Sequence, residues 1–437
     1  MMKAARNKRG VALMLVLSAI VLLTTMGVEF AYNTNVSYHL AKNDLDRLRA
    51  YYLAKSAYSF MLLELKFDKT FRQVVQQQNL GQYLGANAQL PLCQQFPIST
   101  GLIRAVFTGG GLPGMGGEEG GETAGEEAEG GGEEGGGAEL EEMRKRTSFG
   151  QESTAEEFLS FDGDFDGECS DEGTKIDLNS FAGLSAQAAD GAVSPFDQYK
   201  QFLFRFLSRP QYENLFKTAE VRVADVVTNI GDWIDTNTEI NPMGGGGGGV
   251  ERAAYDRAGL PYQPRGGKLI TLMEAYLIDG VVDDWFTPLM DQFTIYGDGK
   301  INVCTAGQDV VESLIRRYVD DTPSLPPLRL EDPEEMGRLL QAIYDTCATG
   351  ATGDQLKSQL NAAINEAIGA LSPGAEQPTQ PAQQGSAGFA SYVSTERRFF
   401  GLNLAGQVDD TTVRIQAVMD MKESDPKRWK LLYWRVH

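Results

Sequence analysis

An uncharged run of eighteen residues, Val11 to Val28, follows a basic start and ends just before Glu29. As a helix with a rise of ~1.5 Å per residue, the run spans about 27 Å, which is long enough to cross the hydrocarbon core of a bilayer. By the positive-inside tendency, the basic residues before it keep this end of the chain in the cytoplasm. These are Lys3, Arg6, Lys8 and Arg9. The run therefore predicts a single membrane span.

A cleaved secretory signal is the alternative, but it would have a shorter apolar region followed by a small-x-small cleavage site. Here bulky residues follow, in "MGVEFAYNTNVSYHL", and no proline occurs between Met1 and Leu90 to end a helix. Apolar residues continue at three- to five-residue spacing, as on one face of an amphipathic helix. They are Leu40, Leu45, Leu48, Tyr52, Ala57, Phe60, Leu63 and Phe67. We therefore expect one stem helix over residues 11–67.

The charge and the histidine content exclude several classes of function. A formal net charge of -21 disfavours nucleic acid as a partner. With only two histidines, His39 and His437, histidine-based catalysis is not expected, and the sequence has no GxSxG motif and no P-loop. We therefore predict that the chain is not an enzyme. The four cysteines have no CxxC spacing and allow three pairings into two disulfides, or four separate thiols. They are Cys93, Cys169, Cys304 and Cys347.

Two segments have the composition of loops. Residues 109–142 are mostly glycine and glutamate, with eleven acidic residues and no basic one. Such a segment cannot bury enough apolar surface to order itself, and the sequence does not say whether it spaces domains, attracts calcium or is inert. Residues 372–388 are rich in proline, glutamine and glycine and are typical of a linker.

Two acidic clusters are candidate calcium sites. In the first, Asp162, Asp164 and Asp166 alternate before Gly167, like the first half of an EF-hand loop, but Gly173 stands where a bidentate glutamate is expected. The second cluster has oxygen donors only, which points to calcium rather than to zinc or iron. It comprises Asp232, Asp235, Asn237, Glu239 and Glu251. The alternative for both clusters is a solvated acidic loop.

The rest of the chain predicts helices and then strands. Residues from about 183 to 371 show helical patterning, and "KLITLMEAYLIDGVVDDWFTPLM" resembles a helix-hairpin-helix whose acidic residues disfavour DNA. The runs "GLIRAVF" and "TKIDLNSF" are strand-like. Near the C-terminus, two alternating segments flank the turn Asp409-Asp410 and suit an antiparallel sheet with one buried face.

The beginning of the chain resembles the type IV pilin class. In that class a membrane peptidase, the prepilin peptidase, cuts after the glycine that ends a basic leader, and the apolar helix stays as anchor and assembly stem. The resemblance places the cut between Gly10 and Val11. Most pilins have a glutamate at the fifth position after the cut, where this chain has Leu15. An unpaired carboxylate in a bilayer costs several kcal/mol, so a glutamate at this position needs the amine of a neighbouring subunit as its partner. A leucine needs no such partner and therefore suits an end position in the fibre.

Three further motifs resemble the K-type minor pseudopilin of type II secretion, a family that also has an apolar residue at that fifth position. They are "TKIDLNS" at 174–180, "DWIDTNTE" at 232–239 and "YGDGKINVCTA" at 296–306. The chain departs from the family at Asn237, where a carboxylate is expected, and at Cys304, where an asparagine is expected. The first departure bears on calcium affinity, and the second suggests a disulfide with Cys347.

The resemblance implies an α+β fold like that of type IV pilins, in which a long N-terminal helix packs on an antiparallel sheet and a large helical insertion interrupts the chain. The expected divisions are a leader (1–10), the stem (11–67), the first part of the pilin-like domain (68–182), the insertion (183–371), the linker (372–388) and C-terminal strands (389–437). The implied function is to cap the tip of the pseudopilus, initiating its assembly and supporting export.

The implied partners are I- and J-type minor pseudopilins, prepilin peptidase, the inner membrane, and secreted cargo or the outer-membrane channel. The bulk of the chain would lie in the periplasm after a single membrane pass. Rival functions are a minor type IV pilin, a calcium-dependent surface adhesin, a membrane-anchored periplasmic enzyme and a DNA-uptake protein. The missing catalytic motifs oppose the enzyme, and the acidic charge opposes DNA uptake.

Overall fold

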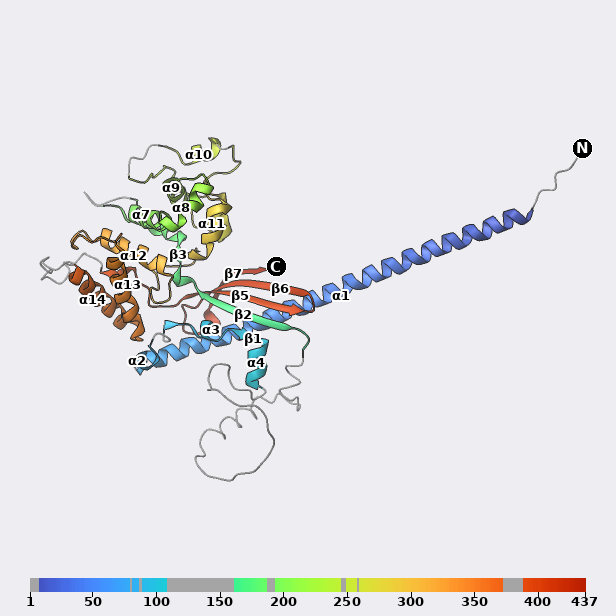
Figure 1. Ribbon diagram of the computed structural model, residues 1–437, viewed down its shortest axis with the longest axis horizontal. Coiled ribbons are helices and arrows are strands. Elements are labelled where there is room, and N and C mark those ends of the chain that lie inside the picture. Colours follow the sequence, from blue (N-terminus) through green and yellow to red (C-terminus); the bar gives the residue numbers. More distant parts are fainter. Residues whose placement is uncertain are drawn as a thin grey trace, which may run out of the picture.

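A single helix, α1 (Lys8–Gln77), dominates the shape of the molecule and runs away from the body as a long stem (Figure 1). The computed structural model describes residues 8–78, 81–85, 89–107, 161–186, 193–244, 249–257, 259–371 and 388–437. The stem is ten residues longer at its C-terminal end than the predicted span over 11–67, because no proline or glycine stops it before Gln77. The glycine- and glutamate-rich segment and almost all of the linker lie outside the described residues.

The outer and inner parts of the stem have different surroundings. Side chains 12–45 are exposed, whereas the inner part buries one face. The buried residues of that face that pack on the sheet recur at helical spacing and are fully buried: Ala50, Ala54, Ala57, Met61 and Leu65. Small residues let the helix backbone approach the sheet. At Gly406 a Cβ atom would lie only 2.1 Å from the carbonyl oxygen of Ala50, so glycine is required there.

The inner part of the stem packs on a five-stranded sheet of order β1-β2-β5-β6-β7, in which every neighbouring pair is antiparallel. The strands are β1 (Ile98–Ser99), β2 (Asp164–Asp171), β5 (Phe399–Val408), β6 (Thr411–Asp420) and β7 (Lys430–Val436). The predicted hairpin is confirmed: β5 and β6 pair from Val408↔Thr411 to Phe399↔Asp420. The alternating residues of β6 are buried as predicted, namely Val413, Ile415, Ala417 and Met419. The expected pilin-like α+β architecture is thus present.

Two segments predicted as strands differ in the structure. "GLIRAVF" forms the helix α4 (Thr100–Phe107), because a short apolar run fits either structure and the hydroxyl of Ser99 accepts a hydrogen bond from the amide of Leu102. "TKIDLNSF" has only the two-residue strand β3 (Ile176–Asp177). There the Asp177 carboxylate accepts from the Asn179 amide and starts the 3₁₀ turn η3 (Leu178–Gly183).

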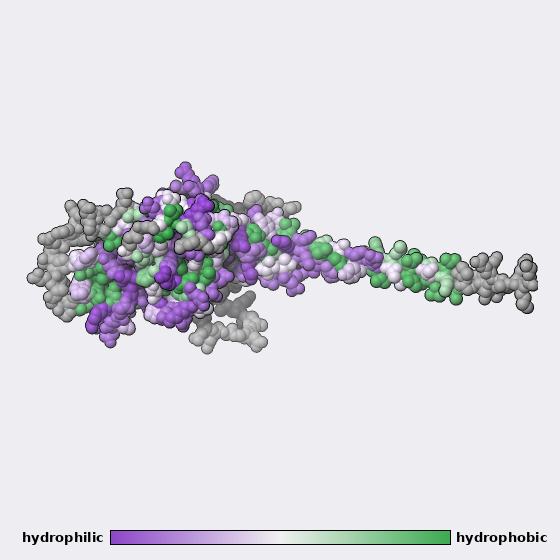
Figure 2. All heavy atoms as spheres, turned by 90° about the horizontal axis from the view of Figure 1, so that it is seen from above, coloured by the Kyte–Doolittle hydropathy of each residue, from purple (hydrophilic) through white to green (hydrophobic). Residues whose placement is uncertain are grey.

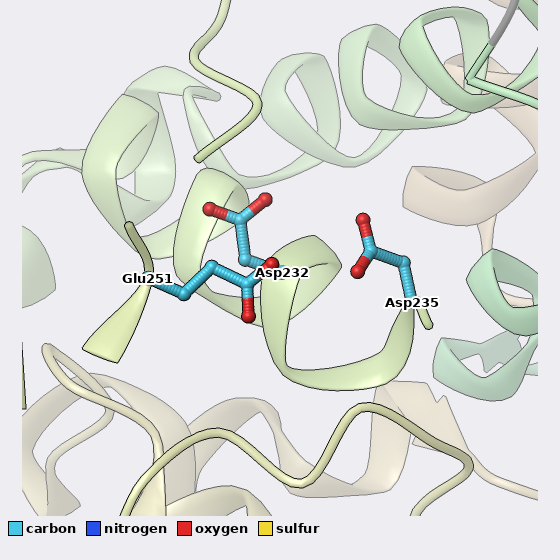
Figure 3. Close-up of side chains that lie close together, drawn as sticks. All are labelled: Asp232, Asp235 and Glu251. Atoms are coloured by element: carbon cyan, nitrogen blue, oxygen red, sulfur yellow. The ribbon is translucent and has the colours of Figure 1, made fainter. Parts of the chain in front are cut away.

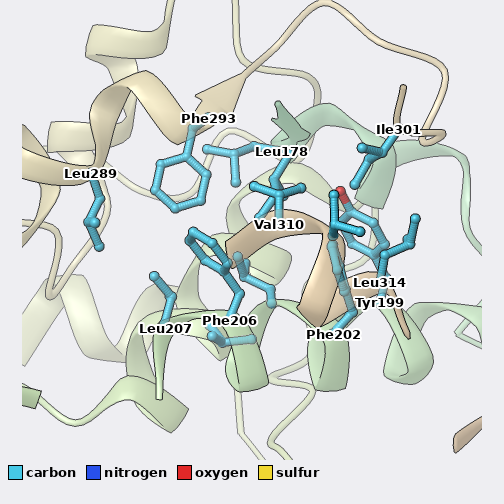
Figure 4. Close-up of a cluster of buried hydrophobic side chains, with 14 of the residues drawn as sticks. Leu178, Tyr199, Phe202, Phe206, Leu207, Leu289, Phe293, Ile301, Val310 and Leu314 are labelled. Carbon is cyan, nitrogen blue, oxygen red and sulfur yellow. The ribbon is translucent and has the colours of Figure 1, made fainter. Parts of the chain in front are cut away.

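The helical insertion lies between β2 and β5 and has its own core. Figure 4 shows part of this core, where Phe206, Phe293 and Val310 pack together from elements far apart in sequence. Its helices are α7 (Pro195–Leu207), α8 (Glu213–Thr218), α9 (Val223–Ile234), α10 (Arg252–Arg257), α11 (Asp283–Leu289), α12 (Gln308–Asp320), α13 (Pro333–Ala348) and α14 (Gly353–Leu371). Helix α7 starts directly after Ser194, whose hydroxyl caps it by accepting a hydrogen bond from the amide of Asp197.

Shorter elements complete the fold. Near the end of the stem lie α2 (Gly81–Leu84) and α3 (Leu92–Gln95). The strand β4 (Phe293–Thr294) pairs in parallel with β3. Short 3₁₀ turns make up the remainder: η2 (Glu172–Thr174), η4 (Pro210–Tyr212), η5 (Leu272–Leu277), η6 (Met290–Gln292), η7 (Phe389–Tyr392) and η8 (Pro426–Arg428). The hairpin-like unit predicted around Gly280 is formed by η5 and α11.

Two disulfides tie elements together. Cys93 of α3 is bonded to Cys169 of β2, and Cys304 is bonded to Cys347 of α13. The first closes a loop of 76 residues in the pilin-like body and the second a loop of 43 residues in the insertion. Each bridge restricts the unfolded chain and thereby stabilises the folded one.

We expect the double variant Cys93→Ser/Cys169→Ser to lose ~2–4 kcal/mol of unfolding free energy, as urea unfolding would measure, because the bridge that limits the unfolded chain is removed. Serine keeps the size of each side chain, which makes loss of the bond the main change. With a reducing agent present, the unmodified chain should lose at least as much stability, because both bridges are then broken. A midpoint equal to that of the unmodified chain under oxidising conditions would contradict the expectation.

Candidate functional site

Three buried carboxylates meet at the end of α9. Asp232 lies in the last turn of α9 and Asp235 directly follows the helix, so both project from the same side at a spacing of three residues. Glu251 returns from a later segment, just before α10. The short antiparallel bridge Glu239↔Val250 places Glu251 beside the segment that follows α9. The amide of Glu251 donates to the carbonyl of Thr238 at 3.2 Å.

The three carboxylates are close enough to share one ion. An oxygen atom from each lies within 4.8 Å of the other two, and the close-up in Figure 3 shows the side chains around one space. Asp232, Asp235 and Glu251 are only 4%, 7% and 6% exposed. Oε1 of Glu251 has no hydrogen-bond partner among the described residues. A buried acceptor of this kind is costly unless something binds it.

The electrostatics of the cluster also favour a bound positive charge. Burial raises the pKa of Glu251 to about 8, and repulsion from the two aspartates adds to the shift. Burial likewise raises the pKa of Asp232 and that of Asp235, each to about 6. Carboxylates that are buried and close together resist ionisation unless a cation compensates their charge. The cluster is therefore suited to a cation.

Other polar groups around the cluster supply only part of that compensation. Asn237 and Asn241 donate side-chain hydrogen bonds to Asp235 at 2.6 and 3.1 Å, and the backbone amide of Asn241 donates to Asp232 at 3.2 Å. The buried ammonium of Lys200 donates to the carbonyl oxygen of Asn241 at 2.7 Å. Asn241 and Lys200 were not predicted from sequence. Asn241 continues the two-residue spacing of the predicted residues before it, which was a signal that could have identified it, whereas Lys200 is distant in sequence.

The donor set fits calcium better than a transition metal, because the three grouped side chains are all carboxylates and no histidine or cysteine is among them. Of the five residues predicted for this cluster, the structure groups Asp232, Asp235 and Glu251. Asn237 contacts Asp235 through its amide nitrogen, and the exposed Glu239 lies outside the group. These three carboxylates would hold the ion.

The first acidic cluster has a different structure from the predicted loop. Asp164 and Asp166 lie within strand β2, paired with β5, and Asp162 lies two residues before the strand begins. All three are exposed, while Phe165 between them is buried. Side chains two residues apart on a strand are separated by about 6.6 Å along it, so these carboxylates do not converge as they would in an EF-hand loop. The expected loop is wrong because the same alternation equally fits a strand.

The outer stem carries the other predicted functional residues. Within α1, the stretch Ala12–Val75 is long and apolar enough to cross a membrane by length and composition, with a mean hydropathy of 2.1 in its most apolar window. Figure 2 shows hydrophobic side chains gathered at the outer end of the stem and hydrophilic ones over much of its middle. Gly10 and Val11 lie within α1, and Leu15 is exposed on it. The side chains of residues 12–28 in this segment are exposed, so they are available for lipid or for other helices.

Similarity to known proteins is found among solved structures. No protein-family model matches the sequence, and no curated protein matches it. Among solved structures, the chain is similar to one from the GspK-GspI-GspJ complex of the type 2 secretion system of enterotoxigenic Escherichia coli. The TM-score is 0.37 with 13% sequence identity, over 63% of this chain and 80% of that one.

Proposed function

We propose that this chain is a K-type minor pseudopilin, a non-enzymatic subunit that caps the tip of the type II secretion pseudopilus, initiates its assembly and supports export across the outer membrane. The observation that carries the proposal is the stem. Its outer part is apolar, exposed and long enough to cross a bilayer, whereas its inner part packs on an antiparallel sheet. One helix therefore serves as membrane anchor first and as fibre core after assembly.

The size of the helical insertion supports a position at the tip. Helices α7 to α14 form a second core beside the pilin-like body (Figure 1). Subunits in the shaft of a fibre are surrounded by neighbours above and below, and a head this large leaves little room for them. Leu15 agrees with this position, because it provides no carboxylate to pair with the amine of a neighbouring subunit.

The proposal includes specific partners and a location. Prepilin peptidase would remove residues 1–10, the inner membrane would hold the stem, and the head would lie in the periplasm, where the two disulfides can form. I- and J-type minor pseudopilins would contact the chain at the tip, and secreted cargo or the outer-membrane channel would meet the exposed head. The same architecture would also suit a minor type IV pilin or a calcium-dependent adhesin.

Calcium binding is part of the proposal. An ion held by Asp232, Asp235 and Glu251 would join the end of α9 to the segment that precedes α10. The ion would supply the positive charge that these buried carboxylates lack, and it would do no chemistry. Its role would be to keep this side of the insertion folded in the periplasm.

The variant Leu15→Glu tests the tip position. At a tip no earlier subunit supplies an amine, so the new carboxylate would stay unpaired in the membrane at a cost of several kcal/mol. We expect site-specific cross-linking of the variant to I- and J-type partners to fall strongly, while Leu15→Ile leaves it unchanged. Undiminished cross-linking of Leu15→Glu would show that a carboxylate finds a partner there and would oppose a tip position.

A further inference from the structure

A cavity of about 470 Å³ lies where the stem meets the insertion, and it is lined by an excess of basic residues in a chain whose net charge is -21. The cavity, here called the junction pocket, takes its walls from the end of α1, the start of α14 and the segments on either side of the β5–β6 hairpin. Its basic residues are Lys69, Arg72, Lys357, Arg397, Arg398 and Lys422. Only two acidic residues line it, Asp354 and Glu396.

Internal ion pairs neutralise only some of these basic side chains. Arg72 pairs with Asp68, and Arg398 pairs with Asp420 at 2.7 Å. Within the described part of the chain, neither Lys69 nor Lys422 has a carboxylate oxygen within 4.0 Å.

The remaining contacts leave positive charge in the lining of the pocket. The ammonium of Lys69 donates to the carbonyl oxygens of Met421 and Glu423, each at 2.6 Å, which orients it without cancelling its charge. Lys357 reaches only the fully exposed Asp354, at 3.9 Å. A pair this long and this exposed contributes little.

The basic groups also repel one another inside the pocket. Burial and then the nearby Arg72 lower the pKa of Lys69, and the same two causes lower the pKa of Arg397 to about 10. Repulsion between positive charges at a partly buried place is a cost that an added anionic group would relieve. The exposed amide side chain of Gln73 also lines the pocket and adds a hydrogen-bond donor suited to a carboxylate oxygen. The amides of Gln89 and Asn302 line it too, but they donate within the protein, to the carbonyl oxygen of Ala351 and to the carboxylate of Asp171.

We propose that the junction pocket binds the carboxylate side chains of an acidic peptide segment supplied by a partner protein. A lipid headgroup offers negative charge as well, but it lies out of reach when the stem spans the membrane as proposed above. Lys69 is about 60 Å along α1 from Val28, at ~1.5 Å per residue. The basic groups come from several elements around the cavity, so they match a segment with several carboxylates better than a single small anion.

The test uses the full chain in detergent micelles and a short fluorescent peptide of glycine and glutamate, with fluorescence anisotropy as the readout. The pocket variant is Lys357→Glu/Lys422→Glu, and the matched control, Lys55→Glu/Lys217→Glu, makes the same charge change at exposed lysines outside the pocket. We expect the pocket variant to bind about tenfold more weakly or worse, because two attractive charges become repulsive, and the control to change by less than about threefold.

Two further measurements keep the outcome clear. A peptide with glutamine in place of glutamate should not bind, and the affinity of the unmodified chain for the glutamate peptide should fall as salt is added. Equal melting temperatures would show that the variants are folded. The proposal is overturned if the unmodified chain does not bind the acidic peptide, if the glutamine peptide binds equally well, or if the pocket variant binds like the control. None of these results depends on whether the chain belongs to a fibre.

Discussion

Gly10→Phe is expected to leave the basic leader on the chain and to abolish export. The proposed peptidase cuts between Gly10 and Val11, and a glycine before the cut leaves space that a bulky side chain would fill. The uncut chain would be ten residues longer. Its N-terminal amine would remain at the far end of the leader instead of on Val11, where assembly needs it. Gel mobility and N-terminal sequencing of the membrane-extracted protein, together with the amount of cargo outside the cell, are the measurements.

Gly27→Phe is the matched control for this variant. Gly27 lies in the same apolar helix, and nothing lies within 4 Å of a Cβ atom placed there. The control should therefore be cut normally and start at Val11. Normal cutting of Gly10→Phe would oppose the pilin-type reading of the leader, and failure of both variants to be cut would show that the effect is not specific to the cleavage position.

Calcium is expected to make the folded chain substantially more stable. Calcium at about 100 times its dissociation constant should raise the unfolding free energy by ~2.7 kcal/mol, because it binds the folded chain and not the unfolded one. Asp232→Asn/Asp235→Asn removes two charges from the cluster and should abolish the increase in melting temperature. The control Asp225→Asn changes an exposed aspartate of the same helix, α9, and should keep the increase.

The effect of calcium should also depend on pH. The pKa values of the three carboxyls are raised in the folded chain, to about 8 for Glu251 and about 6 for each aspartate. Without metal, the favourable contribution of these groups is therefore complete below pH ~4 and is lost as the pH rises towards 8. Calcium replaces the lost protons, so its stabilisation should be larger at pH 8 than at pH 5. A calcium effect that does not change over this range would contradict a site made of these carboxylates.

Much of the fold follows from local patterns in the sequence. The stem is predictable because its apolar residues continue without proline. The β5–β6 hairpin is predictable because strict alternation flanks the Asp409-Asp410 turn. The helix α4 was predicted as a strand, since a short apolar run has no clear period. Its capping residue, Ser99, was the signal that could have identified it.

The candidate metal site was only partly predictable. Asp232 and Asp235 lie three residues apart, and this spacing predicts that their side chains are neighbours at the end of a helix. Lys200 reaches the site from α7, and a contact between residues so far apart in the chain cannot be predicted from local sequence patterns. For Asp164 and Asp166, the interleaved Phe165 is the residue that favours a strand with one polar face over a calcium loop.

The most direct test of the proposed tip position is the composition of the complex that the chain forms in the membrane. Native mass spectrometry of the tagged full-length chain, extracted in mild detergent from cells that make the secretion system, gives the number of copies of each subunit. The account predicts one copy of this chain with one I-type and one J-type subunit, each starting at the residue after its leader. Many copies of this chain in one fibre, or no I- and J-type partner at all, would contradict it.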